Sequence, residues 1–210
     1  MSHESFGMQE TVFIVDDDPA VREGLCDLLE SAGLRAKGYS TAEEFVEARN
    51  PDMAGCLVLD VKLPQMSGLE LQAKLAEEEM TIPIIIMTAY ADIATVRKAL
   101  KTGAVEFLVK PFHDSELLKA VYQAFAMDRE RRQKDSVVSS IRTRMETLTE
   151  REREVLELVT AGLMNKQIAD KLCLSLVTIK MHRGQAMKKM GVKTVPDLVR
   201  MWQAFRGRGA

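Results

Sequence analysis

The chain has 210 residues, of which 46% are hydrophobic and 29% are charged. This length suits one or two ordinary domains, and the composition is that of a globular protein rather than of a disordered chain or a small disulfide-stapled module. No stretch approaches the ~18 to 20 apolar residues of a membrane span, and the N-terminus lacks a basic region followed by an apolar core, so we expect a cytoplasmic chain with no membrane partner. The three cysteines, Cys26, Cys56 and Cys173, lack C-x-x-C spacing and are expected to be small buried hydrophobic side chains.

The formal net charge of -2 hides a division of charge along the chain. Residues 1–125 carry 11 Lys and Arg against 21 Asp and Glu, a net charge of -10, and residues 126–210 carry the remaining 18 against 10, a net charge of +8. Two parts of opposite sign indicate two domains with different partners, and the basic part points to a polyanion. We predict domains at 1–125 and 147–210, joined by a linker at 126–146.

Short apolar runs alternate with segments of helical periodicity in the acidic part. Strands are predicted at 11–15, 34–39, 56–59, 83–87 and 105–109. Helices are predicted at 19–32, 42–49, 68–78 and 93–102, with a fifth beginning near residue 115. This alternation predicts a doubly wound α/β domain with a five-stranded parallel sheet, whose ligand site lies at the carboxyl ends of its strands.

No strand pattern follows residue 126. Residues 126–146 read as a helical connector, with Asp128 and Arg132 spaced as an i,i+4 pair. Beyond it, the Thr149 and Glu152 capping box opens the first of four short helices, predicted at 149–161, 165–172, 175–190 and from 194. A tight turn between the second and third of these helices predicts a helix-turn-helix module.

Charged and polar residues stand where four of the predicted strands end. Asp16, Asp17 and Asp18 follow the first strand, and Asp60 ends the third. Thr88 and Lys110 end the fourth and fifth strands. A cap on the first helix explains Asp16 to Asp18 about as well as a metal site does. Together, however, carboxylates, a hydroxyl and an ammonium group suit an aspartyl phosphate held with Mg²⁺ or another divalent cation such as Mn²⁺. Asp60 is the best nucleophile candidate, because it stands alone while Asp16 and Asp17 can share the metal.

Several motifs in this part resemble the receiver domain of two-component response regulators, which has a flavodoxin-like fold. They are Val-Asp-Asp-Asp at 15–18, Leu-Val-Leu-Asp at 57–60, Met-Thr-Ala at 87–89 and Val-Lys-Pro-Phe at 109–112. The resemblance implies that Asp60 accepts phosphate from a histidine kinase, and that Asp16, Asp17, Asp60 and the backbone carbonyl of Lys62 hold the metal. It also implies that Thr88 and Lys110 bind the phosphoryl group, and that Thr88 and Phe107 form the switch, although Phe107 also fits an ordinary core position.

The third helix of the basic part has two distinct faces. Five Lys or Arg and no acid lie between residues 175 and 193, which favours a helix in the major groove of DNA. We expect DNA contacts from Val177, Thr178, Lys180, Met181, His182, Gly184, Gln185 and Lys188. The inward face is predicted to hold Leu176, Ile179, Ala186, Met187 and Met190. Arg183 also falls inward and is expected to bind Glu154 or a nearby phosphate.

Leu-Thr-Glu-Arg-Glu at 148–152 and Thr-Ile-Lys-Met-His-Arg at 178–183 resemble the LuxR-type DNA-binding domain, so the whole chain is similar to FixJ/NarL-like response regulators, and more to the FixJ branch. The resemblance implies a regulator in which phosphorylation promotes homodimer formation and binding to double-stranded DNA, with RNA polymerase as a further partner. A metal-dependent phosphatase is the rival enzyme class, but it usually carries an acid where Lys62 stands. The third alternative keeps the DNA-binding module but makes the receiver a dimerisation platform that is not phosphorylated. We also hypothesise that Lys62, with Tyr90, slows self-dephosphorylation.

Overall fold

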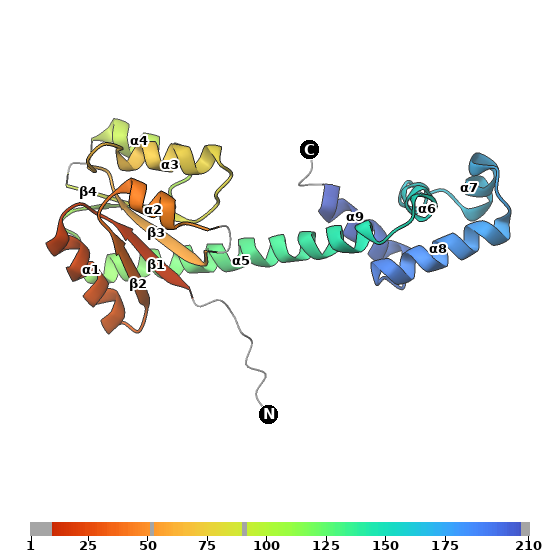
Figure 1. Ribbon diagram of the computed structural model, residues 1–210, viewed down its shortest axis with the longest axis horizontal. Coiled ribbons are helices and arrows are strands. Elements are labelled where there is room, and N and C mark those ends of the chain that lie inside the picture. The colour runs from red at the N-terminus through yellow and green to blue at the C-terminus, as the bar shows by residue number, and fades with distance from the viewer. Residues whose placement is uncertain (1–9, 51–52, 90–91, 207–210) are drawn as a thin grey trace, which may run out of the picture. The chain divides into compact units, whose positions relative to one another are not determined.

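The computed structural model describes residues 10–50, 53–89 and 92–206. Their contacts divide the chain into two compact units, with the boundary between Arg131 and Arg132. Figure 1 shows a sheet with helices on both faces in the first unit and helices in the second. No helix within the described ranges combines the length and the apolar character that crossing a membrane requires.

The strands of the first unit form one parallel sheet in the order β2-β1-β3-β4-β5. They are β1 (Thr11–Val15), β2 (Arg35–Tyr39), β3 (Gly55–Asp60), β4 (Ile84–Thr88) and β5 (Glu106–Val109). The strand order reverses between β1 and β3, because the chain first adds β2 on one side of β1 and then continues on the other. This reversal is the switch point at which doubly wound sheets bind ligands, and the predicted fold class is confirmed.

Helices cover both faces of the sheet. They are α1 (Pro19–Ser31) and α5 (Asp114–Glu146) on one face, and α2 (Ala42–Ala48), α3 (Gly68–Glu77) and α4 (Ile93–Lys101) on the other. Within β1, Val12 and Ile14 pack toward α1 and α5, whereas Phe13 and Val15 pack toward the opposite layer. Both faces are therefore apolar, and polar chemistry is left to the strand ends. Thr41 and Asp92 are the N-caps of α2 and α4, since each side chain accepts a hydrogen bond from a backbone N–H in the first turn of its helix.

The helix α5 continues without a break through the predicted linker, since residues 114–146 contain no glycine or proline. Asp128 is fully buried and accepts hydrogen bonds from the Gly55 amide at 3.0 Å and from Arg131 at 2.5 Å. Arg131 also donates to the Thr81 hydroxyl at 2.8 Å. The beginning of the predicted linker thus packs on the first unit.

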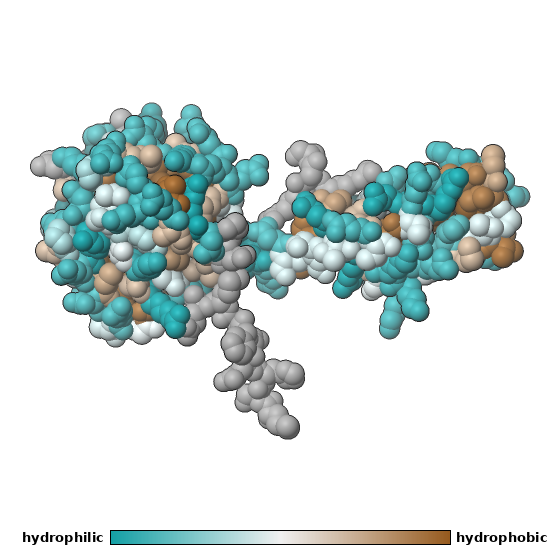
Figure 2. Space-filling model, in the orientation of Figure 1, coloured by the Kyte–Doolittle hydropathy of each residue, from teal (hydrophilic) through white to brown (hydrophobic). Residues whose placement is uncertain are grey.

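The second unit contains α6 (Glu150–Thr160), α7 (Asn165–Leu172), α8 (Leu176–Met190) and α9 (Val195–Arg206). Its core includes Leu156, Ile179 and Trp202, and the capping box of Thr149 with Glu152 is confirmed. Glu152 is only 3% exposed and pairs with Lys189 at 2.6 Å. Figure 2 shows hydrophobic side chains gathered at the end of this unit where α7 and α8 meet, in keeping with the exposed Met164, Leu176 and Val177.

The expectation of three buried cysteines is right only for Cys56. Cys26 is half-buried on α1, and Cys173 is exposed at the end of α7 with φ at +53°. Cys173 lies in the turn that the sequence predicts between the helices at 165–172 and 175–190, and its position there leaves the side chain exposed.

Candidate functional site

Two buried carboxylates lie side by side at the carboxyl edge of the sheet. Asp16 directly follows β1 and is 1% exposed, and Asp60 ends β3 and is 5% exposed. The strands β1 and β3 are paired in parallel with Val15 opposite Leu59, so the next residues along each strand are neighbours. The prediction that these strand ends bring acids together is confirmed for this pair.

Lys110, at the end of β5, contacts both carboxylates. Its Nζ lies 2.6 Å from Asp16 Oδ2 and 2.9 Å from Asp60 Oδ1. The remaining oxygens bind backbone amides: Asp16 Oδ1 accepts from Asp18 N–H at 3.0 Å, and Asp60 Oδ2 accepts from Lys62 N–H at 2.7 Å. Each carboxylate is therefore held by one charged partner and one peptide group, which fixes the orientation of both.

Burial and charge act in opposite directions on these groups. Burial raises the pKa of Asp60 above its ordinary value and the charge of Asp16 adds to this, whereas the hydrogen bond and charge of Lys110 oppose it. Burial favours a lower pKa for Lys110, but the hydrogen bonds to Asp16 and Asp60 outweigh it, and the pKa of the ammonium group is raised. The site thus keeps a cation between two acids, and burial makes the ionised form of Asp60 less favourable than it would be in water.

The other predicted pocket residues occupy distinct positions. Thr88 is 1% exposed at the end of β4, the strand between β3 and β5, and its carbonyl accepts a hydrogen bond from Lys110 N–H at 2.8 Å. Phe107 is half-buried at the edge of the apolar layer formed with α2, α3 and α4. Asp17 is exposed. Asp18 caps α1 by accepting from Ala20 N–H at 2.8 Å, so the capping interpretation holds for Asp18 while Asp16 turns into the pocket.

The donor set of the pocket fits a hard divalent cation, because the buried carboxylates of Asp16 and Asp60 supply oxygen ligands of the kind that Mg²⁺ and Mn²⁺ prefer. Among the described residues, no group of three or more His, Cys, Asp or Glu side chains is assembled to hold a metal ion. Lys110 supplies the positive charge between Asp16 and Asp60 in this arrangement. The ligand set Asp16, Asp17, Asp60 and the Lys62 carbonyl stays a prediction.

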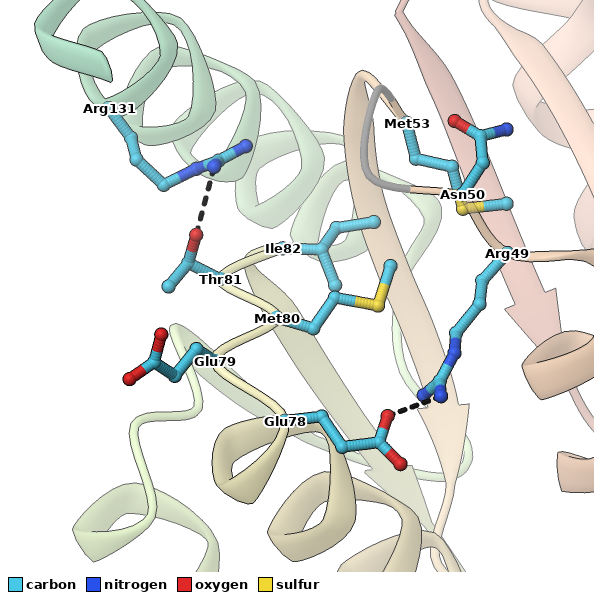
Figure 3. A pocket seen from close by; sticks show the side chains of 9 residues that line it. All are labelled: Arg49, Asn50, Met53, Glu78, Glu79, Met80, Thr81, Ile82 and Arg131. Atoms are coloured by element: carbon cyan, nitrogen blue, oxygen red, sulfur yellow. Dashed lines mark hydrogen bonds and ion pairs between the residues drawn. The ribbon is translucent and has the colours of Figure 1, made fainter. Parts of the chain in front are cut away.

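A separate cavity of about 300 Å³ lies at the opposite edge of the sheet, where the loops before β3 and β4 meet α5 (Figure 3). An ion pair between Arg49 and Glu78 lines it, and the Arg131 contact with Thr81 closes another side. These residues lie at the amino ends of the strands, so the cavity is not part of the carboxylate site.

The predicted DNA-contacting residues lie on α8 of the second unit. Six of them are exposed: Val177, Lys180, Met181, Gly184, Gln185 and Lys188. Thr178 and His182 are half-buried, and the Thr178 hydroxyl is 2.8 Å from that of Ser175, the N-cap of the helix. This exposed face carries no acid and presents both cations and apolar side chains.

The inward face of α8 differs from the prediction in two respects. Ile179, Ala186 and Met190 are buried as expected, but Leu176 is 43% exposed because it is the first residue of the helix, beyond the reach of the core. Arg183 donates to Asn165 Oδ1 at 2.6 Å, whereas the predicted partner Glu154 pairs with Arg151 of its own helix. The helical wheel correctly predicted that Arg183 faces the other helices, but it did not identify the helix that Arg183 contacts.

Sequence reasoning missed Arg22 of α1, whose guanidinium donates to the Asp16 carbonyl at 2.7 Å behind the acidic loop. No motif marked it, because α1 was read only as a covering helix.

Comparison with known proteins agrees with this arrangement. Residues 12–122 match the family described as response regulator receiver domain, and residues 146–202 match the bacterial regulatory proteins of the luxR family. A receiver joined to a LuxR-type helix-turn-helix module defines the class of DNA-binding response regulators. This chain belongs to the two-component response regulators of that type, in the FixJ group.

Similar proteins cover nearly the whole chain. Nodulation protein W of Bradyrhizobium diazoefficiens is 44% identical over 199 residues, which are 95% of this chain and 88% of that protein. Transcriptional regulatory protein FixJ of Rhizobium meliloti is 41% identical over 192 residues, 91% of this chain and 94% of that protein. A solved structure of response regulator StyR has a TM-score of 0.84 and 45% identity, covering 93% of this chain and 98% of that one. The two domains imply a cognate kinase and DNA as partners, and a regulator of transcription rather than a classical enzyme.

Proposed function

We propose that Asp60 accepts a phosphoryl group from a sensor histidine kinase, and that the phosphorylated chain forms a homodimer that binds operator DNA. The observation that carries the proposal is the contact of Lys110 with both Asp60 and Asp16 at the carboxyl edge of the sheet. A carboxylate beside a fixed ammonium group is suited to receive a phosphoryl group, because the cation neutralises charge that arrives on the phosphoryl oxygens.

In the transfer step, a carboxylate oxygen of Asp60 attacks the phosphorus of phosphohistidine. The new O–P bond forms as the P–N bond breaks, and the imidazole leaves with the electron pair of that bond. Asp60 needs no general base, since its carboxylate form is the nucleophile. Lys110 and the Thr88 hydroxyl then hold phosphoryl oxygens. Mg²⁺ or Mn²⁺, held by Asp16, Asp17, Asp60 and the Lys62 carbonyl, would neutralise further phosphoryl charge when bound.

The switch needs more than the Thr88 contact. A charge-assisted hydrogen bond from Thr88 contributes about 1.5 to 3 kcal/mol. Moving a population from 1:99 to 99:1 takes about 5.5 kcal/mol. Burial of Phe107, which is half-buried here, and formation of the dimer are the sources we assign to the difference.

The dimer surface we propose lies on α4 and β5, where a second copy of the chain covers exposed apolar side chains. Ile93 is 80% exposed, and Leu100 and Val109 are also exposed. The position of β5 supports this assignment, because the strand contains Phe107 and Val109 and is followed directly by Lys110 of the pocket.

DNA binding is assigned to the exposed face of α8, with Lys180 and its outward neighbours reaching bases and Lys188 near the backbone. Two modules brought together by the receivers engage half-sites about one helical turn apart. Pairing raises affinity by effective concentration, and RNA polymerase is a further partner of the bound dimer.

Slow self-dephosphorylation is part of the proposal. Lys62 is exposed two residues after Asp60, near the path of a hydrolytic water. Tyr90, the second residue of this hypothesis, lies outside the described residues. Lys62→Asn is expected to shorten the acyl-phosphate lifetime, and an unchanged lifetime would remove the hypothesis.

The experiment that tests the proposal is light scattering coupled to size-exclusion chromatography, with and without a small phosphodonor and Mg²⁺. The wild-type chain is expected to shift from monomer to dimer and to hold one acyl phosphate, and Asp60→Asn is expected to do neither. Repeated turnover of phosphomonoesters would support a phosphatase instead. A dimer that forms equally well in Asp60→Asn would support the unphosphorylated platform.

A further inference from the structure

We propose that Arg22 is a positioning residue for the acidic loop at 16–18, and that Gly38 of β2 provides the space through which Arg22 reaches it. Arg22 Nη1 donates to the Asp16 carbonyl at 2.7 Å and makes a longer contact of 3.5 Å with the Asp17 carbonyl. This inference deepens the function proposed for the Asp60 pocket and rests on it for its biological meaning.

The contacts of Arg22 determine which way the peptide groups of the loop face. In a planar trans peptide the carbonyl and the following N–H point in opposite directions. Because the Asp17 carbonyl faces Arg22, the Asp18 N–H faces the other side, where it donates to Asp16 Oδ1 at 3.0 Å. That hydrogen bond leaves Asp16 Oδ2 directed at Lys110, 2.6 Å away. The guanidinium thus influences the orientation of the Asp16 carboxylate without contacting it.

Gly38 makes this reach possible. A β-carbon at position 38 would lie 2.7 Å from Cγ and 2.9 Å from Cδ of Arg22, closer than such atoms approach. The aliphatic part of Arg22 therefore passes over β2 at Gly38, the one position of this strand without a side chain. Glycine weakens a strand, and inside one it often marks the close approach of another group. The neighbouring position of α1 and β2 in Figure 1 agrees with this crossing.

Two backbone hydrogen bonds hold the ends of the loop. Asp16 N–H donates to the Tyr39 carbonyl at 3.2 Å, and Arg22 N–H donates to the Asp18 carbonyl at 3.0 Å. These bonds fix the two ends of the loop but not the plane of the peptide between Asp17 and Asp18. That middle segment is held by the contacts of Arg22 with the Asp16 and Asp17 carbonyls on one side and by the hydrogen bond from Asp18 N–H to Asp16 Oδ1 on the other.

Two variants remove the proposed contact by different routes. Arg22→Met removes the guanidinium and keeps most of the aliphatic stem, and Gly38→Ala keeps the guanidinium but displaces it. The chain offers a matched control for each. Arg35→Met changes an exposed arginine of β2, and Gly24→Ala adds a methyl group on α1 where no atom lies within 4 Å.

The measurements are the dissociation constant of Mn²⁺, followed by electron paramagnetic resonance on the full unphosphorylated chain, and the exchange rate of the Asp18 amide, followed by NMR. We expect Arg22→Met and Gly38→Ala to raise the Mn²⁺ dissociation constant about tenfold, within the range seen for outer-shell partners of metal sites. We also expect both variants to speed exchange at Asp18, and both controls to match the wild type.

Urea unfolding distinguishes a local effect from loss of the fold. Arg22→Lys, which keeps the stem and a donor, is expected to recover part of the Mn²⁺ affinity. Unchanged Mn²⁺ binding and unchanged Asp18 exchange in a folded Arg22→Met chain would overturn the proposal, as would equal effects in the controls. Neither readout requires phosphorylation, so failure of Asp60 as a phosphoacceptor would leave this test of Arg22 separate and decisive.

Discussion

Replacing Lys110 by methionine removes the ammonium group that contacts Asp16 at 2.6 Å and Asp60 at 2.9 Å. These two distances place the contacted oxygens at most about 5.5 Å apart. Two unit charges at that separation repel by about 3 kcal/mol at an effective dielectric constant of 20. Two charged hydrogen bonds are lost as well, so without metal we expect Lys110→Met to destabilise the receiver by about 3 to 5 kcal/mol, the usual cost of removing one partner of a buried ion pair.

Urea unfolding of the full chain in the presence of a chelator measures this cost. Far-UV circular dichroism follows both units, while fluorescence of Trp202, the single tryptophan, follows the DNA-binding unit alone and serves as an internal control. Asp60→Asn removes one of the two repelling charges, so in that background Lys110→Met is expected to cost about 2 to 3 kcal/mol less. A Lys110→Met chain as stable as the wild type, or a double variant no more stable than Lys110→Met, would refute the electrostatic account of the pocket.

Three further predictions concern both units. Asp60→Asn is expected to be more stable than the wild type at neutral pH. Because the pKa of Asp60 is raised in the folded chain, the stability of the wild type falls as pH rises from 3.8 through the folded-state pKa. The urea midpoints of the two chains should therefore converge below this pH range. Lys189→Met leaves Glu152 buried without its cation and is expected to cost about 3 kcal/mol in Trp202-monitored unfolding. Burial opposes the lowered pKa of Glu152 but the Lys189 hydrogen bond outweighs it, so this cost should shrink as pH falls through that pKa. Lys180→Ala is expected to weaken binding to a duplex selected from a random library by about 1 to 3 kcal/mol in fluorescence anisotropy, with Arg35→Ala unchanged; equal losses in both variants would argue against base contact by α8.

The sheet and the meeting of Asp16, Asp60 and Lys110 were predictable from sequence for one physical reason. Strands buried on both faces read as continuous apolar runs, and parallel pairing brings the residues that follow those runs to one edge. Once the strands were located, little freedom remained for the charged residues at their ends. The capping box of Thr149 and Glu152 was predictable for a second reason, since a cap depends on residues only a few positions apart.

Contacts between elements were harder to predict, because they depend on how helices cross rather than on periodicity. Arg183 was correctly turned inward but binds Asn165 of α7 instead of Glu154. Asp128 was predicted in the linker, spaced to pair with Arg132, but the structure buries it against Gly55 of the first unit. The sequence did not indicate a role for Arg22 of α1, because that role depends on the absence of a side chain at Gly38 in β2.

The most direct test of the central claim is to locate the phosphoryl group. The full chain is incubated with a small phosphodonor and Mg²⁺, and its intact mass and the peptide containing residue 60 are measured, with DNA binding followed on the same sample. We expect one acid-stable, base-labile acyl phosphate on Asp60, tighter DNA binding by the modified chain, and neither change in Asp60→Asn. A phosphoryl group on another residue, or DNA binding that strengthens equally in Asp60→Asn, would contradict the account.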